Sequence, residues 1–183
     1  VFFSGIMRFA MRRQIHQLVA GYREGDAISN TANLMREVFR AWGFESDIFC
    51  EQGYASKGKV SVTRDLLTLH KILNPDDIAI LHLSIGCSAN LVFEQLNCRK
   101  VIVYHNITPP SYFELVGQST AKMLSDGREQ MAHLAGIADL NVADSQYNAD
   151  ELIAAGYKDV KVLPLPINLD MFNHSDRNRA TLS

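Results

Sequence analysis

Hydrophobic residues in this chain fall into short runs, and between the runs they recur at helical spacing. Six runs have the length and composition of buried β-strands: Ile15–Val19, Asp47–Cys50, Ile78–Leu83, Val101–Tyr104, Leu140–Ala143 and Val160–Leu163. Strands that alternate with helices are typical of a parallel sheet covered on both faces. The pattern therefore predicts an α/β protein with a doubly wound, mostly parallel, Rossmann-like sheet.

The first helix is expected to begin near Asn30, capped by Ser29 or Asn30, and to end before Gly43. Its apolar face consists of Leu34, Met35, Val38, Phe39 and Trp42. Further helices are predicted over Leu66–Ile72, Leu91–Leu96, Tyr112–Gln118, Thr120–Ile137 and, behind a Ser145 cap, up to Ala155. The polar segment Gln52–Thr63 lacks periodicity and is interpreted as a mobile surface loop.

The 183 residues suffice for one ordinary core, which we assign to residues 13–172. Residues 1–12 are interpreted as a leader, possible alternatives being a disordered stretch or an interfacial membrane segment built from Phe2, Phe3, Phe9, Arg8, Arg12 and Arg13. Residues 173–183 are polar and are interpreted as a linker or frayed end towards a second domain missing from this chain.

Composition excludes several classes of function. A formal net charge of −2 provides no global attraction to nucleic acid. No apolar run approaches the roughly 20 residues that a spanning helix needs. Cys50, Cys87 and Cys98 are odd in number and widely spaced, so they indicate reduced thiols of a cytoplasmic protein. The histidines have no spacing that suggests metal ligation.

Polar residues follow the predicted strands at the carboxyl edge, where open parallel sheets bind ligands. They are Gly25 to Asn30, Ser84 to Gly86, His105-Asn106 and Asp144-Ser145. The loop at Gly25 and the following helix could bind phosphate or a hydroxyl-rich ligand, or could be a tight turn before a capped helix. No G-x-G-x-x-G fingerprint is present.

His105 could donate to a sugar hydroxyl or phosphate, or act as an acid or base, or simply be a satisfied residue at a strand end. Asp144 and Ser145 are more typical of a helix cap than of a ligand contact. These alternatives stay open on residue chemistry alone.

Five motifs in order resemble the N-terminal half of family 4 glycosyltransferases of the GT-B fold. The motifs are Ile15-His16-Gln17, Gly25-Asp26-Ala27-Ile28, Val101 to Pro110, Asp144-Ser145-x-x-Asn148-x-x-Glu151-Leu152, and Val162 to Phe172. The resemblance covers residues 13–172 and implies the acceptor-side domain of a two-domain enzyme. It also implies retaining, metal-independent transfer of a hexose from a nucleotide diphosphate sugar to a saccharide or lipid-linked acceptor, without a cofactor.

By this resemblance, His105 is the catalytic residue that approaches the transferred sugar, through electrostatic positioning and not proton transfer. Substrate contacts are assigned to Gly25, Asp26, Asn106, Asp144 and Ser145. The donor-binding half is missing, so we expect negligible turnover from this chain alone. Two alternatives remain: a binding subunit that pairs with a separate donor-binding chain, and an unrelated nucleotide-binding Rossmann enzyme.

Overall fold

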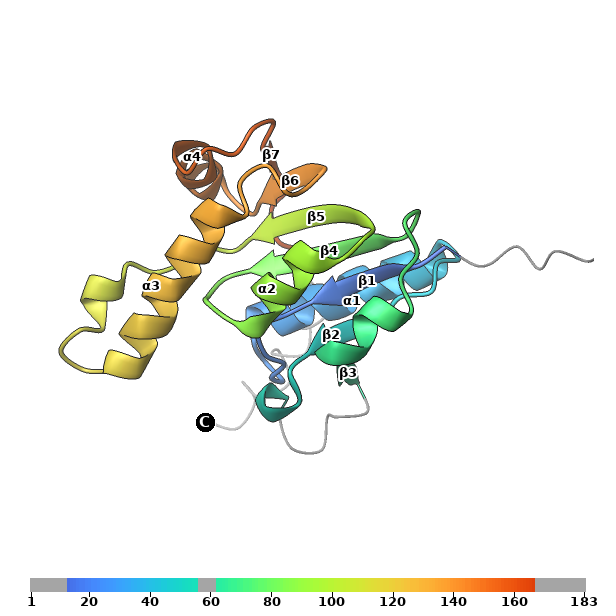
Figure 1. Ribbon diagram of the computed structural model, residues 1–183, viewed down its shortest axis with the longest axis horizontal. Helices are drawn as coiled ribbons and strands as arrows, with labels where there is room; N and C mark the ends of the chain where they lie inside the picture. The colour runs from blue at the N-terminus through green and yellow to red at the C-terminus, as the bar shows by residue number, and fades with distance from the viewer. Residues whose placement is uncertain (1–12, 56–61, 167–183) are drawn as a thin grey trace, which may run out of the picture.

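The computed structural model describes residues 13–55 and 62–166 of the chain. Within these residues a single parallel sheet has the strand order β3-β2-β1-β4-β5-β6-β7 (Figure 1). The strands are β1 (Ile15–Leu18), β2 (Ile48–Cys50), β3 (Thr63–Asp65), β4 (Ile78–Leu83), β5 (Arg99–Tyr104), β6 (Leu140–Ala143) and β7 (Lys161–Val162). The helices are α1 (Ala27–Ala41), α2 (Ser88–Gln95), α3 (Gln118–His133) and α4 (Gln146–Ala154). The doubly wound α/β fold predicted from the sequence is confirmed.

The direction of winding reverses between β1 and β4. From β1 the chain adds β2 and β3 on one side, then returns and adds β4 to β7 on the other. Strands β1 and β4, which lie on either side of this reversal, pair in parallel, with Leu18 opposite Leu81. Such a reversal leaves a crevice beyond the carboxyl ends of the two strands, and open α/β sheets bind their ligands there. The fold therefore singles out the loops after β1 and β4.

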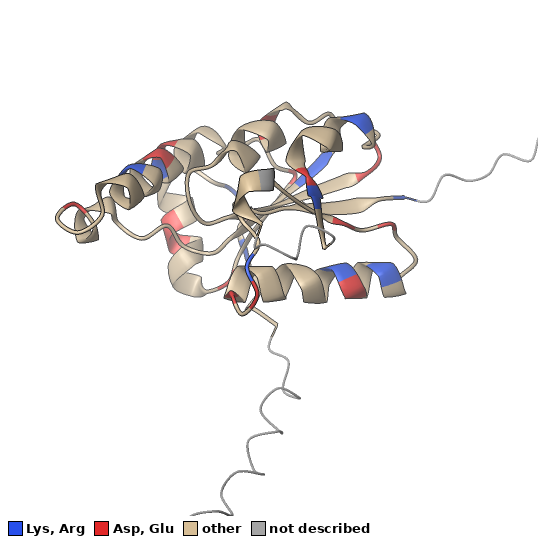
Figure 2. Ribbon diagram, turned by 90° about the horizontal axis from the view of Figure 1, so that it is seen from below, with Lys and Arg blue, Asp and Glu red and all other residues tan. Residues whose placement is uncertain are grey.

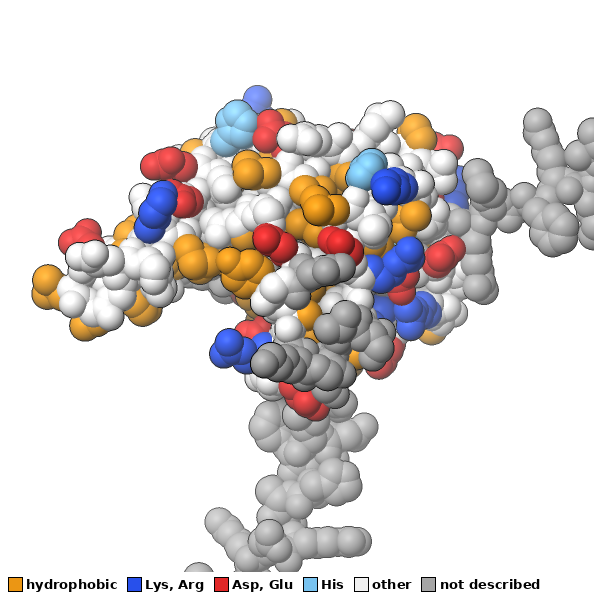
Figure 3. Space-filling model, turned by 60° about the horizontal axis from the view of Figure 1, so that its bottom comes forward, with side chains coloured by type: hydrophobic (Ala, Val, Ile, Leu, Met, Phe, Trp, Pro, Cys, Tyr) orange, Lys and Arg blue, Asp and Glu red, His pale blue; other side chains and the backbone are white. Residues whose placement is uncertain are grey.

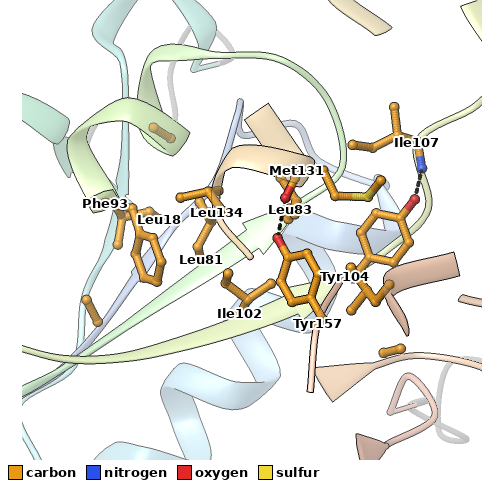
Figure 4. Close-up of a cluster of buried hydrophobic side chains, with 14 of the residues drawn as sticks. Leu18, Leu81, Leu83, Phe93, Ile102, Tyr104, Ile107, Met131, Leu134 and Tyr157 are labelled. Carbon is orange, nitrogen blue, oxygen red and sulfur yellow. Dashed lines mark hydrogen bonds between the residues drawn. The ribbon is translucent and has the colours of Figure 1, made fainter. Parts of the chain in front are cut away.

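The helices lie in two layers, with α1 on one face of the sheet and α2 and α3 on the other (Figures 1 and 2). Alternate side chains of each strand point to opposite faces, so the sheet contributes to both layers. The larger core lies under α2, α3 and α4, and its buried members include Leu81, Phe93, Ile102, Leu134 and Tyr157 (Figure 4). On the α1 face the buried clusters are smaller.

The hydrophobic pattern of the sequence did not predict strand β3. Residues 52–63 were predicted to be a loop, but the structure has a 3₁₀ turn, η1 (Gln52–Tyr54), and places Thr63 in β3, paired with β2. This strand has three residues, of which only Thr63 is buried. A short edge strand next to charged residues carries no alternating apolar signal, because one face and one edge meet solvent. Residues 56–61 of that loop, and the predicted leader and tail, lie outside the described residues.

Several helix predictions need correction. Helix α2 begins at Ser88 and not at Leu91, and α3 ends at His133 and not at Ile137. Helix α1 begins at Ala27, three residues before the predicted start, because Asp26 is its cap. The segment Leu66–Lys71 is a 3₁₀ helix, η2. The predicted helix Tyr112–Gln118 is absent. In its place are a 3₁₀ turn, η3 (Pro110–Tyr112), and a protruding turn (Figures 1 and 3). Leu115 in this turn is 98% exposed.

Candidate functional site

His105 lies directly after β5, at the carboxyl edge of the sheet. Because strand side chains alternate, it points to the same face as Val103, towards α1. Its side chain is only 2% exposed. The Nε2 atom lies 2.9 Å from Nδ1 of His82, and the Nδ1 atom lies 3.5 Å from a carboxylate oxygen of Asp144. The predicted catalytic residue is thus held between a second histidine and an acid.

A hydrogen-bond chain beneath His105 assigns the protons on both rings. The side-chain amide of Gln17 donates to the Ala32 carbonyl of α1 at 2.9 Å, which turns its oxygen towards Nε2 of His82, also at 2.9 Å. His82 must donate from Nε2, so its Nδ1 accepts from Nε2–H of His105. Nδ1 of neutral His105 then has a free lone pair, and this atom has no hydrogen-bond partner within the described residues.

The two histidines differ in how readily they accept a proton. Burial lowers the pKa of His82 to about 3, with a further contribution from His105. Burial also lowers the pKa of His105, but the charges of Asp144 and Asp26 oppose this shift. His105 is therefore the group in the pair that can gain a proton, at Nδ1, while His82 remains a neutral acceptor.

The buried, neutral His82 makes stability depend on pH. The unfolded chain binds a proton at this residue below about pH 6.5, whereas the folded chain binds one only near pH 3, so stability falls as the pH falls through this window. We expect His82 to reduce the free energy of unfolding by about 2 kcal/mol between pH 7 and pH 5. Urea denaturation at both pH values measures the difference.

In the His82→Gln variant this part of the pH dependence should disappear, whereas His133→Gln, at an exposed position, should retain it. Equal pH dependence in the wild type and the His82→Gln variant would contradict a buried neutral histidine.

Asp144 and Asn106 are joined through Asn148 of α4. The Asn106 amide donates to Asn148 at 3.0 Å, and Asn148 in turn donates to the second carboxylate oxygen of Asp144. Asn106 has a positive φ of 74°, a conformation that asparagine tolerates better than most residues. Ser145 caps α4 by accepting from the Asn148 backbone N–H, as predicted. These contacts orient Asp144 towards His105.

Asp26 is the N-cap of α1, and its carboxylate accepts from the backbone N–H and the hydroxyl of Ser29, both at 2.9 Å. Gly25, with a φ of 81°, makes the turn before it. The sequence suggested free N–H groups near Asn30 that could bind phosphate. Instead, a carboxylate already occupies the positive end of this helix, and it would repel a phosphate group placed there.

A cavity of about 450 Å³ opens at the winding reversal, between the loops after β1, β2 and β4. Its polar lining includes Tyr22, Arg23, Asp26, Glu51, Ser84 and Ser88. The Ser88 hydroxyl donates to Glu51 at 2.6 Å, which links two walls. Asp26 lines this cavity and also raises the pKa of His105, so the cavity and the histidine are neighbours.

The loop that carries His105 and Asn106 is held from the opposite face of the sheet. The Tyr104 hydroxyl accepts from the Ile107 backbone N–H at 3.0 Å (Figure 4) and donates to Glu151 of α4. Arg128 of α3 forms an ion pair with Glu151 at 2.8 Å and donates to the Ile107 carbonyl. Two helices therefore fix the backbone immediately after His105.

Of the predicted residues, the structure brings His105, Asp144 and Asn106 together, with Asp26 close enough to affect His105. Gly25 and Ser145 have local roles in a turn and a cap. Gln17, Asn148 and Glu151 belong to the motifs quoted from the sequence but were given no role there, and His82 and Arg128 were not singled out as parts of this arrangement. The available signal was a polar residue inside an apolar strand, since His82 interrupts Ile78–Leu83 and Gln17 interrupts Ile15–Val19.

Comparison of the chain with protein-family models and with curated proteins gives no match. The three cysteines are free, with Cys50 buried and the other two half-buried. In residues 13–55 and 62–166, no cluster of three or more His, Cys, Asp or Glu side chains is placed to hold a metal ion. None of the helices in these ranges is long and apolar enough to cross a membrane.

Proposed function

We propose that this chain is the acceptor-side half of a retaining, metal-independent GT-B glycosyltransferase, resembling family 4. In this proposal the complete enzyme transfers a hexose from a nucleotide diphosphate sugar to a saccharide or lipid-linked acceptor. The observation that carries the proposal is the buried His105 with Asp144 at its Nδ1, beside a polar cavity at the winding reversal. The sequence motifs on the same loops add independent support.

The charges around His105 suit a sugar that develops positive charge as its bond to the leaving group breaks. Asp144 and Asp26 both act on His105, so the carboxyl edge is locally negative. Carboxylates fixed in a partly buried site stabilise an oxocarbenium-like transition state without having to reorient. His105 is buried against Asp144, and when protonated its Nδ1 can donate to this carboxylate and so orient it for a sugar hydroxyl. This role positions the sugar and needs no proton transfer.

The cavity favours a hydroxyl-rich ligand over a nucleotide. Its polar groups include Asp26 and Glu51, which would repel phosphate, and the α1 N-terminus is occupied by Asp26. Hydroxyl groups can both donate to carboxylates and accept from Arg23 or Ser84. The unrelated nucleotide-binding enzyme is therefore the weaker alternative. A binding subunit that pairs with a separate donor-binding chain shares this acceptor site.

The proposal predicts that the chain binds saccharides in preference to nucleotides. A panel of mono- and disaccharides, and of UDP, GDP and ADP, can be titrated into the chain while imidazole signals are followed by NMR. We expect the His105 signals to shift with one or more saccharides. His105→Ala should weaken that binding about tenfold, because Asp144 then loses the side chain that orients it.

His133→Ala, at an exposed position on α3, is the matched control and should bind as the wild type does. Tight binding of a nucleotide at the Gly25 loop, with no saccharide binding, would refute the proposal. Efficient sugar transfer by residues 1–183 alone would also refute it, since the donor half would then be unnecessary.

A further inference from the structure

A row of hydrogen-bonding side chains crosses the sheet from α1 to the carboxyl edge. Gln17 of β1 and His82 of β4 are buried, and the side chain of His105 after β5 is 2% exposed. The links Gln17–His82 and His82–His105 are each 2.9 Å long, and the last link, from Nδ1 of His105 to Asp144, is 3.5 Å. Because the ring atoms are buried, each link needs a hydrogen of its own.

The row has three links, but its two neutral imidazoles supply only two N–H groups. A backbone carbonyl can only accept, so Ala32 fixes the amide nitrogen of Gln17, and the amide oxygen then faces His82. The two N–H groups therefore fill the first two links. In the third link a lone pair of His105 lies opposite a carboxylate oxygen of Asp144, with no hydrogen between them. One additional proton, on Nδ1 of His105, completes the row.

The surroundings of His105 decide when this proton binds. The titratable side chains that act on His105 are His82 of β4, Asp144 after β6 and Asp26 at the start of α1. Burial lowers the pKa of His105 below its ordinary value of 6.5, and the two carboxylates oppose this shift. The Asp144 side chain is 15% exposed, which gives a proton from solvent a path to Nδ1. We therefore expect the additional proton to bind below pH 6.5.

We propose that Gln17 is a positioning residue of this site and acts through His82. Its amide oxygen keeps the proton of His82 on Nε2, so that His105 can hold Asp144 only after binding an additional proton from solvent. The cationic ring then donates a charge-assisted hydrogen bond to the carboxylate and fixes its orientation. The effect of this orientation on saccharide binding rests on the proposed function, whereas the positions of the protons do not.

Replacing Gln17 by methionine should reverse the direction of the row. Methionine offers His82 no strong acceptor at Nε2, so both rings can carry their protons on Nδ1. His82 then donates to His105, and neutral His105 donates to Asp144. The reversed row has two links and two N–H groups, so it needs no additional proton.

NMR of the ligand-free chain, labelled with ¹⁵N-histidine, shows which ring nitrogen carries each proton. In the wild type at pH 8 we expect Nε2–H on His82 and His105, and a proton gained at Nδ1 of His105 below pH 6.5. In Gln17→Met we expect Nδ1–H on both rings and no gain at His105 between pH 8 and pH 5. Gln14→Met is the matched control, because the Gln14 side chain accepts from His16 at 2.7 Å and has no contact with the row. This control should titrate as the wild type does.

Saccharide binding provides the functional measurement. The wild type and Gln14→Met should bind a saccharide ligand about tenfold more tightly at pH 5 than at pH 8, whereas Gln17→Met should bind it equally at both. Equal pH dependence in the wild type and Gln17→Met would overturn the proposal. Lack of saccharide binding by all three proteins would refute the proposed function instead, and the ligand-free tautomers would still decide the role of Gln17.

The tautomers of the wild type test the proposal without any variant. An Nδ1–H tautomer of neutral His105 at pH 8 would overturn it. Unchanged tautomers in Gln17→Met, with far-UV circular dichroism showing a folded chain, would also overturn it.

Discussion

Replacing Gly127 by alanine is expected to lower the free energy of unfolding by about 3 kcal/mol. A Cβ atom at this position would lie 2.5 Å from the backbone nitrogen of Gly86 and 2.9 Å from the carbonyl carbon of Ile85. Both neighbours are backbone atoms, so neither can rotate away. Urea denaturation of the wild type and the variant measures the loss.

The same contact makes Gly86→Ala equally unfavourable, since its Cβ would lie 2.6 Å from the Met123 carbonyl oxygen. That oxygen accepts a hydrogen bond from the Gly86 backbone N–H at 3.0 Å. The two glycines thus bring the loop after β4 against α3, where it forms one wall of the polar cavity. Either substitution should also weaken saccharide binding.

Gly53→Ala is the control, because its Cβ would meet nothing within 4 Å. We expect it to change the free energy of unfolding by less than about 0.5 kcal/mol. If Gly127→Ala were as stable as Gly53→Ala, the close approach of α3 to the loop after β4 would be refuted.

Arg128→Met is expected to cost about 3 kcal/mol of unfolding free energy. About 2 kcal/mol comes from leaving the partly buried Glu151 carboxylate without its ion pair, and about 1 kcal/mol from the lost hydrogen bond to the Ile107 carbonyl. Methionine retains much of the apolar stem of arginine. The difference in unfolding free energy between the wild type and the variant therefore measures the contribution of the guanidinium group. Urea denaturation measures it.

Lys122→Met on the same helix is the matched control. Lys122 forms an exposed ion pair with Asp126 one turn away, and its side chain is 74% exposed against 31% for Arg128. Exposed pairs of this kind contribute about 0.3–0.5 kcal/mol. Similar losses in the two variants would show that the Arg128 pair does not hold the loop after β5.

In the Arg128→Met variant the backbone after β5 loses one of its two helical supports. Glu151→Gln combined with Arg128→Met should be less destabilising than the sum of the single changes, because no unpaired charge remains. The NMR signals of His105 should broaden or shift in Arg128→Met, since its backbone follows directly from Tyr104. Signals of His133 at the far end of α3 serve as the internal reference.

Local sequence patterns determined the interior of the sheet. The runs Ile78–Leu83 and Val101–Tyr104 are apolar except for His82, because strands in the middle of a parallel sheet are buried on both faces. Strand β3 escaped prediction because it is a three-residue edge strand. The segment Tyr112–Gln118 was predicted to be a helix, but its Leu115 and Val116 are exposed, so apolar character there does not reflect burial.

The sequence also determined which loops carry the polar residues, because the carboxyl ends of parallel strands share one edge. It could not determine which of those residues touch. That His105 meets His82 and Asp144 depends on the order β1-β4-β5-β6 and on the side to which each residue points. Strand order and register arise from long-range packing, for which no single segment holds the information. The cap at Asp26 and the close contact between Gly86 and Gly127 were likewise decided by the tertiary structure.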